Sequence, residues 1–296
     1  MTPLRVRDLT VSWARPLLMG VVNANHDSFS DPGARTAAEV LARAEALVAA
    51  GARALDIGAQ SAITGRPPAD PADEAAAVVP VLKHVLARFP GVLVSVDTFK
   101  PAVAEAALDA GAHLVNDVSG LRDPALARLC AAASAGLVVM HTAAAPLVRR
   151  QEPGLYADVA AEVAGFLAER IAVAVDAGVP EIAIVVDPGV DFAKTPAQSI
   201  ELLRHLDPVV ALGRPVLLAL SRKDFVGALT RQPPARRDAG TLAAVAAVRW
   251  VPGQILRVHD VAATRDFLTV LDTLAGDDPV PADLVLSDEL RHQRGG

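Results

Sequence analysis

The sequence of 296 residues has little of several features that would point to particular protein classes. Its single cysteine, Cys130, excludes an internal disulfide and fits a reducing compartment. No apolar run approaches the roughly 20 residues of a membrane span, and the first ten residues lack the apolar core of a signal peptide. The net charge is −6, without a basic stripe to neutralise phosphates. We therefore expect a soluble, cytoplasmic protein with no nucleic-acid or membrane partner.

Aromatic residues make up only 3% of the chain, but 52% of it is apolar, so the core must be built from aliphatic side chains. Short apolar segments rich in Val, Ile and Leu alternate with longer Ala-rich segments that end at glycines, which is typical of alternating strands and helices. The expected strands cover residues 17–22, 54–57, 92–96, 113–115, 137–140, 182–186, 215–220 and 255–258.

Eight consecutive strand–helix units in this length predict an α/β fold of the TIM (β/α)8 barrel type. A doubly wound open sheet is the alternative, although it seldom repeats so evenly. Residues 4–13 alternate weakly and are expected to form a short N-terminal hairpin. We predict one barrel domain over residues 1–276, followed by a polar C-terminal tail over residues 277–296.

The segment from Glu181 to Gly189 illustrates the pattern that repeats along the chain. Its apolar residues 182–186 are too few for a helix and rich in β-branching, which favours a strand buried on both faces. Asp187 follows at the strand end, and Pro188-Gly189 turns the chain there. A carboxylate at the mouth of a buried strand is costly unless a cation or hydrogen-bond donors meet it.

Polar residues stand at the carboxyl end of every predicted strand. Any one of them alone would more often be a helix cap or a turn residue. In a TIM barrel, however, these strand ends share one face, where active sites are built. The residues expected to converge there are Asn23, Asp56, Asp97, Asn116, His141, Asp187, Lys223 and His259.

The residue types at this face suggest two kinds of chemistry. Asp97, Asn116 and Asp187 match the N–H edge of a flat, amidine-like heterocycle, and Lys223 would compensate a carboxylate or donate to the ring. Arg257 and His259 lie two apart on the last strand, so their side chains share a face suited to an anion. A surface ion pair is the simpler interpretation of Arg257.

Several motifs, in this order, resemble those of the dihydropteroate synthase family over about residues 17–274. They read Met19-Gly-Val-Val-Asn23, Asp27-Ser-Phe-Ser-Asp31, Ser95-Val-Asp-Thr98, Asn116-Asp-Val-Ser-Gly120, Asp187-Pro-Gly189, Phe192 with Lys194-Thr195, Ser221-Arg-Lys223, Gly240-Thr-Leu-Ala-Ala244 and Arg257-Val-His-Asp-Val261. The resemblance implies a homodimeric TIM-barrel transferase of folate biosynthesis. Its reaction joins 6-hydroxymethyl-7,8-dihydropterin diphosphate to p-aminobenzoate and releases pyrophosphate, through a pterin-stabilised cation that the arylamine attacks.

The resemblance also implies a role for individual positions. The residues expected to bind the pterin are Asp97, Asn116, Met140, Asp187 and Lys223. The residues expected to bind the diphosphate are Asn23, which would also bind Mg²⁺, Arg257 and His259. The residues expected to border p-aminobenzoate are Phe29, Ser221 and Lys223. Lys223, Asp97 and Asp31 would take part in catalysis.

The chain departs from the family pattern in its first two loops and at two glycines. Residues 60–65 read Gln-Ser-Ala-Ile-Thr-Gly in place of Glu-Ser-Thr-Arg-Pro-Gly, and residues 24–26 read Ala-Asn-His in place of Val-Thr-Pro. Asp191 and Ala219 replace glycines and are expected to narrow the pocket. One lost charge-assisted contact to the diphosphate would cost roughly 1.5–3 kcal/mol.

These departures leave alternatives to the synthase reaction open. The chain could bind a pterin and transfer it to another acceptor, or bind a pterin without turnover. A methyltetrahydrofolate-binding methyltransferase shares the barrel, but it would have no use for the anion site at Arg257 and His259. The sequence therefore predicts a divergent member of the family.

Overall fold

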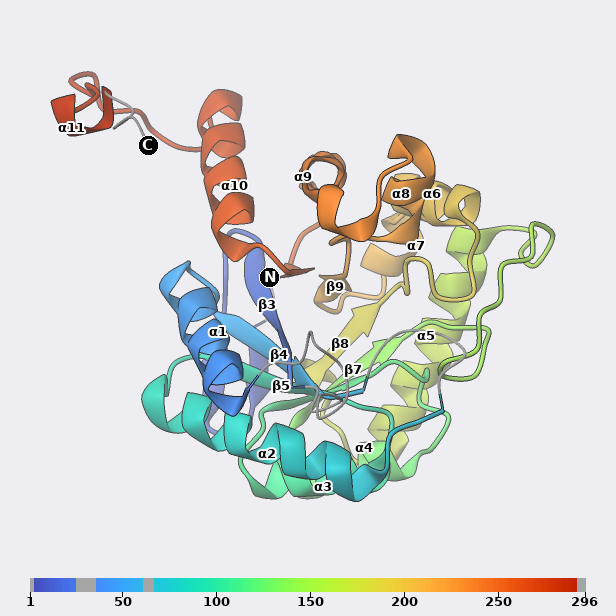
Figure 1. Cartoon of the computed structure of the whole chain (residues 1–296). Coiled ribbons are helices and arrows are strands. Elements are labelled where there is room, and N and C mark those ends of the chain that lie inside the picture. The colour runs from blue at the N-terminus through green and yellow to red at the C-terminus, as the bar shows by residue number, and fades with distance from the viewer. Residues whose placement is uncertain (1–2, 25–35, 61–66, 292–296) are drawn as a thin grey trace.

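The computed structural model describes residues 3–24, 36–60 and 67–291, and within them eight parallel strands close into a barrel with helices outside it (Figure 1). The predicted TIM barrel is thus confirmed. The strands, in their order around the barrel, are β10 (Gln254–Val258), β3 (Leu17–Asn23), β4 (Ala54–Gly58), β5 (Leu93–Asp97), β6 (Leu114–Asp117), β7 (Gly136–Met140), β8 (Ile184–Asp187) and β9 (Val216–Leu218). The antiparallel pair β1 (Leu4–Val6) and β2 (Leu9–Val11) forms the predicted hairpin.

Helices follow the strands with the expected alternation. They are α1 (Ala37–Ala49), α2 (Pro71–Arg88), α3 (Pro101–Asp109), α4 (Ala125–Ala132), α5 (Val159–Asp176), α6 (Pro196–Arg204), α7 (Asp207–Val210), α8 (Asp224–Thr230), α9 (Asp238–Ala247), α10 (Val261–Ala275) and α11 (Asp288–Arg291). Thr36 and Thr195 each begin a helix through a capping box, with Glu39 and Gln198 as the reciprocal partners. Among the described residues, no helix has both the length and the apolar character that crossing a membrane requires.

The barrel strands are buried on both faces, as their uninterrupted apolar sequences predict. Every residue of β7 and β8 is buried, including Asp187 at the end of β8. Parallel strands covered by helices bury both faces, so an alternating polar pattern is not expected. Met140 and Asp187 are paired in register at the ends of these neighbouring strands, which places both at the same rim of the barrel.

Two strands are flanked by extra short helices. α6 ends at Arg204, and the separate short helix α7 lies between it and β9. After β9, α8 begins directly after Lys223 and precedes α9. Lys223 is the N-cap residue of α8 but makes no side-chain capping bond. Its sequence therefore carried no cap signal, and the stabilising contacts come from elsewhere in the fold.

Candidate active site

Four polar residues from separate strands meet at the carboxyl end of the barrel; we call Asp56, Asp97, Asn116 and Arg257 the mouth cluster. Arg257 of β10 donates from Nε to Asp56 Oδ2 at 2.6 Å and from Nη2 to Asp97 Oδ2 at 2.7 Å. Asn116 Nδ2 donates to the same Asp56 oxygen at 3.0 Å. The structure thus brings together residues that lie up to 201 positions apart in the sequence.

One guanidinium group therefore balances two carboxylates in the mouth cluster. Burial, followed by the nearby charge of Asp56, raises the pKa of Asp97 to about 7, although Arg257 acts in the opposite direction. Burial opposes the charge of Arg257, but Asp56 and Asp97 outweigh it and raise the pKa of the guanidinium group. Arg257 therefore stays charged, and Asp97 exchanges a proton near neutral pH.

The mouth cluster also presents buried acceptors with no hydrogen-bond partner within the described part of the chain. They are Asp56 Oδ1 and Asn116 Oδ1, and the hydroxyl of Ser95 on β5 is in the same condition. Buried polar atoms in folded proteins nearly always have a partner. Two carbonyl-type acceptors beside an aspartate suit a ligand that presents several N–H donors along one edge.

Asp187 lies at the carboxyl end of β8, at the same rim of the barrel. Its Oδ1 accepts a hydrogen bond from the Gly189 amide at 2.7 Å. Burial raises the pKa of Asp187, whereas the Gly189 amide, Lys223 and Arg257 act to lower it, so both cations lie within electrostatic reach. Gly189 has a φ of +67°, and a Cβ added there would lie 1.9 Å from the backbone oxygen of His141. This close approach explains why glycine follows Asp187-Pro188.

Lys223 lies at the β9 side of the mouth. Its Nζ donates to the backbone oxygen of Val190 at 2.9 Å and lies 4.5 Å from the centroid of the Phe192 ring. Burial lowers the pKa of Lys223, while Asp191 and Asp187 oppose that effect. The ammonium group is thus held between the loop after β8 and the mouth cluster.

His259 follows β10 and is oriented by Ser221, whose Oγ lies 2.8 Å from Nδ1 of the imidazole. Arg43 of α1 donates to the backbone oxygen of His259. Burial, followed by the charges of Arg222, Arg257 and Arg43, lowers the pKa of His259 to about 4. His259 was expected to bind an anion together with Arg257, but with this pKa its imidazole is neutral at pH 7, so Arg257 supplies the positive charge of the pair.

The other predicted residues lie in different surroundings. Asn23 ends β3, paired with Gly58 of β4, and is exposed at the rim. Phe29 and Asp31 lie outside the described residues. His141 follows β7 and its amide donates to the Asp187 backbone oxygen at 2.9 Å; its side chain is only 4% exposed and packs edge-on against Phe166, with ring centroids 4.9 Å apart.

Lys194 belongs to the family motif of Phe192 with Lys194-Thr195, and no role was expected for it. Its side chain is 0% exposed, and Nζ lies 2.8 Å from His141 Nδ1 and 2.9 Å from the backbone oxygen of Gly189. A third contact, at 3.2 Å, reaches the backbone oxygen of Phe192. Lys194 thus connects the loop after β8 to His141 at the end of β7. Its motif was visible in the sequence, but its burial was not.

Replacing Lys194 by methionine is expected to change how stability depends on pH. Burial lowers the pKa of Lys194 from 10.5 to about 7. Between these values the unfolded chain binds a proton that the folded chain does not, so the wild type should gain stability relative to Lys194→Met as pH rises through this range. Urea denaturation across the range measures it, with the exposed Lys83→Met as control. A difference that is constant with pH would contradict the assignment.

A buried cation connects the two ends of the loop between β4 and α2. Lys100 Nζ donates to Glu74 Oε2 at 2.6 Å, to Gln60 Oε1 at 3.1 Å and to the backbone oxygen of Ala69 at 2.6 Å. Gln60 Oε1 also accepts from the Ala69 amide at 2.8 Å. Gln60, which replaces a glutamate of the family pattern, therefore ties together the two ends of this loop.

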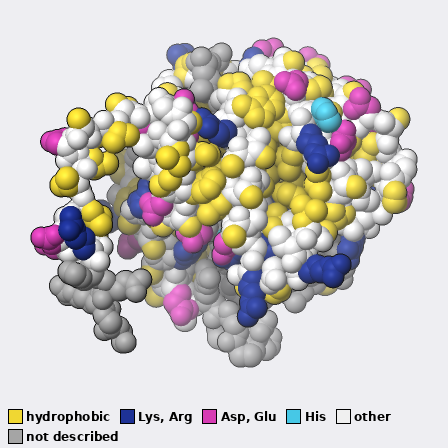
Figure 2. All heavy atoms as spheres, turned by 90° about the horizontal axis from the view of Figure 1, so that it is seen from above, with side chains coloured by type: hydrophobic (Ala, Val, Ile, Leu, Met, Phe, Trp, Pro, Cys, Tyr) yellow, Lys and Arg dark blue, Asp and Glu magenta, His cyan; other side chains and the backbone are white. Residues whose placement is uncertain are grey.

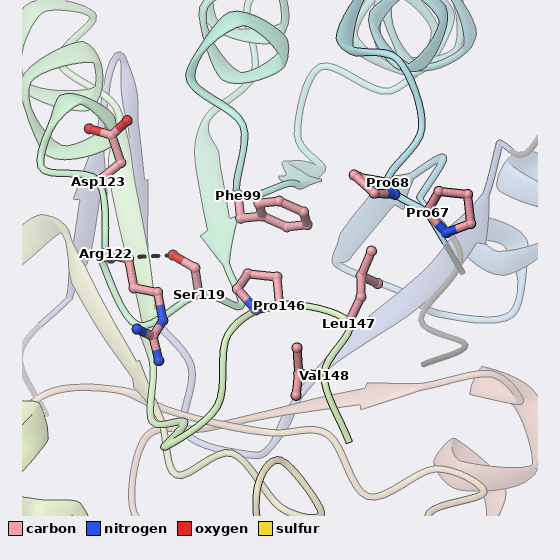
Figure 3. A pocket seen from close by; sticks show the side chains of 9 residues that line it. All are labelled: Pro67, Pro68, Phe99, Ser119, Arg122, Asp123, Pro146, Leu147 and Val148. Atoms are coloured by element: carbon pink, nitrogen blue, oxygen red, sulfur yellow. Dashed lines mark hydrogen bonds between the residues drawn. The ribbon is translucent and has the colours of Figure 1, made fainter. Parts of the chain in front are cut away.

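A separate hollow of about 620 Å³ lies across the loops that follow β4 to β7 (Figure 3). Its walls are mainly apolar, and it is lined by Pro67, Pro68, Phe99, Ser119, Arg122, Asp123, Pro146, Leu147 and Val148. The volume is typical of a small-molecule site. It shares no residue with the mouth cluster, however, and we locate the chemistry at the mouth, where the buried charges and unpaired acceptors are.

The fold and the mouth define the chain as a pterin-binding enzyme with a TIM barrel: the family described as "Pterin binding enzyme" matches residues 19–259. A dihydropteroate synthase of Streptococcus pyogenes is 40% identical over 261 residues, which cover 87% of this chain and 95% of that protein. The chain belongs to the dihydropteroate synthase family.

Solved structures agree with this assignment. A Xanthomonas albilineans dihydropteroate synthase with 4-aminobenzoic acid is 40% identical, with a TM-score of 0.83, and the match covers 95% of this chain and 99% of that one. The same organism's enzyme in complex with 7,8-dihydropteroate is 38% identical, with a TM-score of 0.81, covering 94% and 100%. The similarity therefore extends over nearly the whole barrel.

Proposed function

We propose that this protein is a dihydropteroate synthase that joins 6-hydroxymethyl-7,8-dihydropterin diphosphate to p-aminobenzoate and releases pyrophosphate in folate biosynthesis. The observation that carries the proposal is the mouth cluster, in which buried, partly unpaired acceptors lie beside cations at one rim. The two X. albilineans enzymes, solved with 4-aminobenzoic acid and with 7,8-dihydropteroate, support the same substrates.

The pterin ring is proposed to enter the barrel mouth with its N–H edge toward the acceptors. Asp56 Oδ1 and Asn116 Oδ1 supply two acceptors, and Asp187 supplies a carboxylate at the end of β8, at the same rim. Met140, paired with Asp187 in register, would pack against the ring. Asp97 and Lys223 would contact the ring from opposite sides, and the Asp97 pKa of about 7 lets that group accept or donate a proton.

The diphosphate is proposed to leave toward Arg257, His259 and Asn23. Arg257 Nη1 is not used in the hydrogen bonds to Asp56 and Asp97, so one donor edge is available to the anion. The carbon–oxygen bond to the pterin methylene breaks, and its electron pair leaves with pyrophosphate. Positive charge stabilises that anion as it forms.

Mg²⁺ is proposed to enter with the diphosphate. Mg²⁺ commonly keeps several waters and binds through one or two protein oxygens plus substrate phosphates. The exposed amide oxygen of Asn23 fits that pattern, whereas no group of three or more acidic, histidine or cysteine side chains suited to a metal occurs among the described residues. The ion would supply charge stabilisation for the leaving group, and Asn23 would hold it at the β3 end.

The arylamine is proposed to approach on the β9 side, bordered by Phe29, Ser221 and Lys223. Its nitrogen forms the new bond to the pterin methylene carbon and loses one proton. Asp97 or Asp31 would accept that proton. Phe192, stacked under Lys223, forms part of the same wall.

Pyrophosphate release, measured with and without p-aminobenzoate, tests the proposal. We expect Mg²⁺-dependent release well above the enzyme-free rate, and Lys223→Met should reduce it by about 100-fold or more if two charge-assisted bonds are lost. If another amine stimulated the release more than p-aminobenzoate does, the natural acceptor would be different. The altered loop that begins at Gln60 motivates this alternative. Pterin binding by calorimetry without turnover for any amine would identify a silent binding protein.

A homodimer in the cytoplasm is proposed as the working form. On the face seen in Figure 2, hydrophobic side chains gather over the C-terminal helices. Leu229 after the middle of α8, Trp250 after α9, and Val270 and Leu274 of α10 are all exposed. Exposed apolar areas of this kind favour a protein–protein interface, and sedimentation at micromolar concentration tests whether a second copy covers it.

A further inference from the structure

Asp191, in the loop after β8, has a backbone conformation that is unusual for its residue type. Its φ is +67°, in the left-handed region that glycine adopts freely. Aspartate tolerates this region better than most residues, but the conformation is still less favourable for it than for glycine. The family pattern has glycine at this position. The chain therefore keeps an unfavourable backbone conformation at a position where it has a carboxylate side chain and the family pattern has none.

The Asp191 carboxylate connects three parts of the barrel rim. Ser199 of α6 donates from Oγ to Asp191 Oδ1 at 2.9 Å. The amides of Asp224 and Phe225, at the start of α8, donate to Asp191 Oδ2 at 2.6 and 3.3 Å. Asp191 thus supplies the cap that α8 lacks locally. Asp191, expected from the sequence to narrow the pocket, also has this connecting role.

The same connection fixes both ends of Lys223. Its backbone directly precedes the Asp224 amide that Asp191 holds. Its Nζ donates to Val190, the residue before Asp191, and stacks on Phe192, the residue after it. The lysine side chain therefore lies along the loop to which its own backbone is tied.

The charge of Asp191 also acts on Lys223. After burial, which lowers the pKa of Lys223, Asp191 is the largest influence and raises it, followed by Asp187. Arg257 of β10 acts against protonation, and Asp224 on α8 weakly favours it. Asp191 is therefore the main group that favours the protonated form of Lys223.

We propose that Asp191 is a positioning residue for the acceptor pocket: by tying the loop after β8 to the start of α8, it sets where the Lys223 ammonium group meets the arylamine. The assignment of the pocket rests on the proposed function, but the link between Asp191 and Lys223 does not. Because the family pattern has glycine here, the residue would give this chain an acceptor pocket of its own geometry.

Two variants separate geometry from charge. Asp191→Gly removes all three side-chain contacts and relieves the backbone strain. Asp191→Asn tolerates the positive φ and keeps an acceptor for the Asp224 amide, but loses the charge. Asp224→Asn is the matched control, because the exposed Asp224 side chain is adjacent to Lys223 but pairs with Arg237 and not with the loop after β8.

Lysine NMR measures the result independently of activity. The four lysines of the chain are Lys83, Lys100, Lys194 and Lys223. After reductive ¹³C-methylation, Lys223→Met assigns the Lys223 resonance and exposed Lys83 serves as internal reference. We expect the Lys223 titration midpoint to move to lower pH in both Asp191 variants, and less in Asp224→Asn. An unchanged midpoint in both Asp191 variants would overturn the inference, even if the wild type proved inactive.

Kinetics then test the positioning role in the active enzyme. We expect Asp191→Gly to lower kcat/KM for p-aminobenzoate by about tenfold or more, the equivalent of one to two lost hydrogen bonds. Asp191→Asn should recover most of this loss at pH 7 and show its alkaline limb at lower pH than the wild type. Equal losses in the two variants, or none, would contradict a positioning role. Inactivity of the wild type would instead count against the proposed function.

Discussion

Arg257→Met is expected to destabilise the protein by about 3–5 kcal/mol, because removing one partner of a buried ion pair leaves uncompensated charge. Here two carboxylates are left: Asp56, which is 0% exposed, and Asp97. The proposed diphosphate site loses its arginine in the same step, so pyrophosphate release should be undetectable. Urea denaturation at pH 8, with the activity assay on the folded fraction, measures both effects.

The pH dependence and a double variant show whether the carboxylates are the cause. The pKa of Asp97 is already raised to about 7, and losing Arg257, which lowers it, should raise it further. In the pH range above about 7, the folded variant then holds a proton on Asp97 that the folded wild type has lost, so the cost of Arg257→Met should shrink as pH falls toward about 7 and level off below it. Adding Asp56→Asn should recover part of the stability but not the activity.

A surface arginine provides the comparison for Arg257. Arg265 of α10 pairs with the exposed Asp266, and Arg265→Met should cost no more than about 1 kcal/mol. If Arg257→Met were no more destabilising than this control at pH 8, the mouth cluster would not be an ionic network in solution.

Asp187→Asn is expected to weaken pterin binding by roughly 100-fold or more, since charge-assisted hydrogen bonds contribute about 1.5–3 kcal/mol each. The amide cannot accept from a ring N–H group at every position where a carboxylate can. Stability should be kept or increased, because asparagine still accepts from the Gly189 amide and burial already disfavours the charge of Asp187. Calorimetry with a pterin ligand and thermal unfolding measure the two quantities.

The control for Asp187→Asn is the same substitution at Asp266, whose side chain is 68% exposed. Asp266→Asn should leave both pterin affinity and the melting temperature unchanged. Unfolding of Asp187→Asn would show that the carboxylate is structural. Wild-type affinity in a folded Asp187→Asn variant would remove Asp187 from the pterin site.

The sequence predicted which residues lie at the site, but not which of them contact one another. Asn116 and Asp187 could be predicted to lie at the same rim, because parallel strands in a barrel end at one face. Arg257 was also placed at that face, but as an anion ligand, and its two carboxylate partners were not foreseen. Lys194 was part of a recognised motif, yet nothing in the sequence showed that its ammonium group is fully buried.

The sequence alone determined the eight strand–helix units, the polar residue that closes each strand and the family, because strand period, turn chemistry and motif order are local properties of the chain. Only the tertiary structure decided which charges meet. Arg257 lies 160 and 201 positions from its two partners, and Asp191 lies 33 positions from the helix it caps. Such pairings depend on barrel closure and on the packing of loops against one another. The distances that result set the pKa values and the free acceptors of the site.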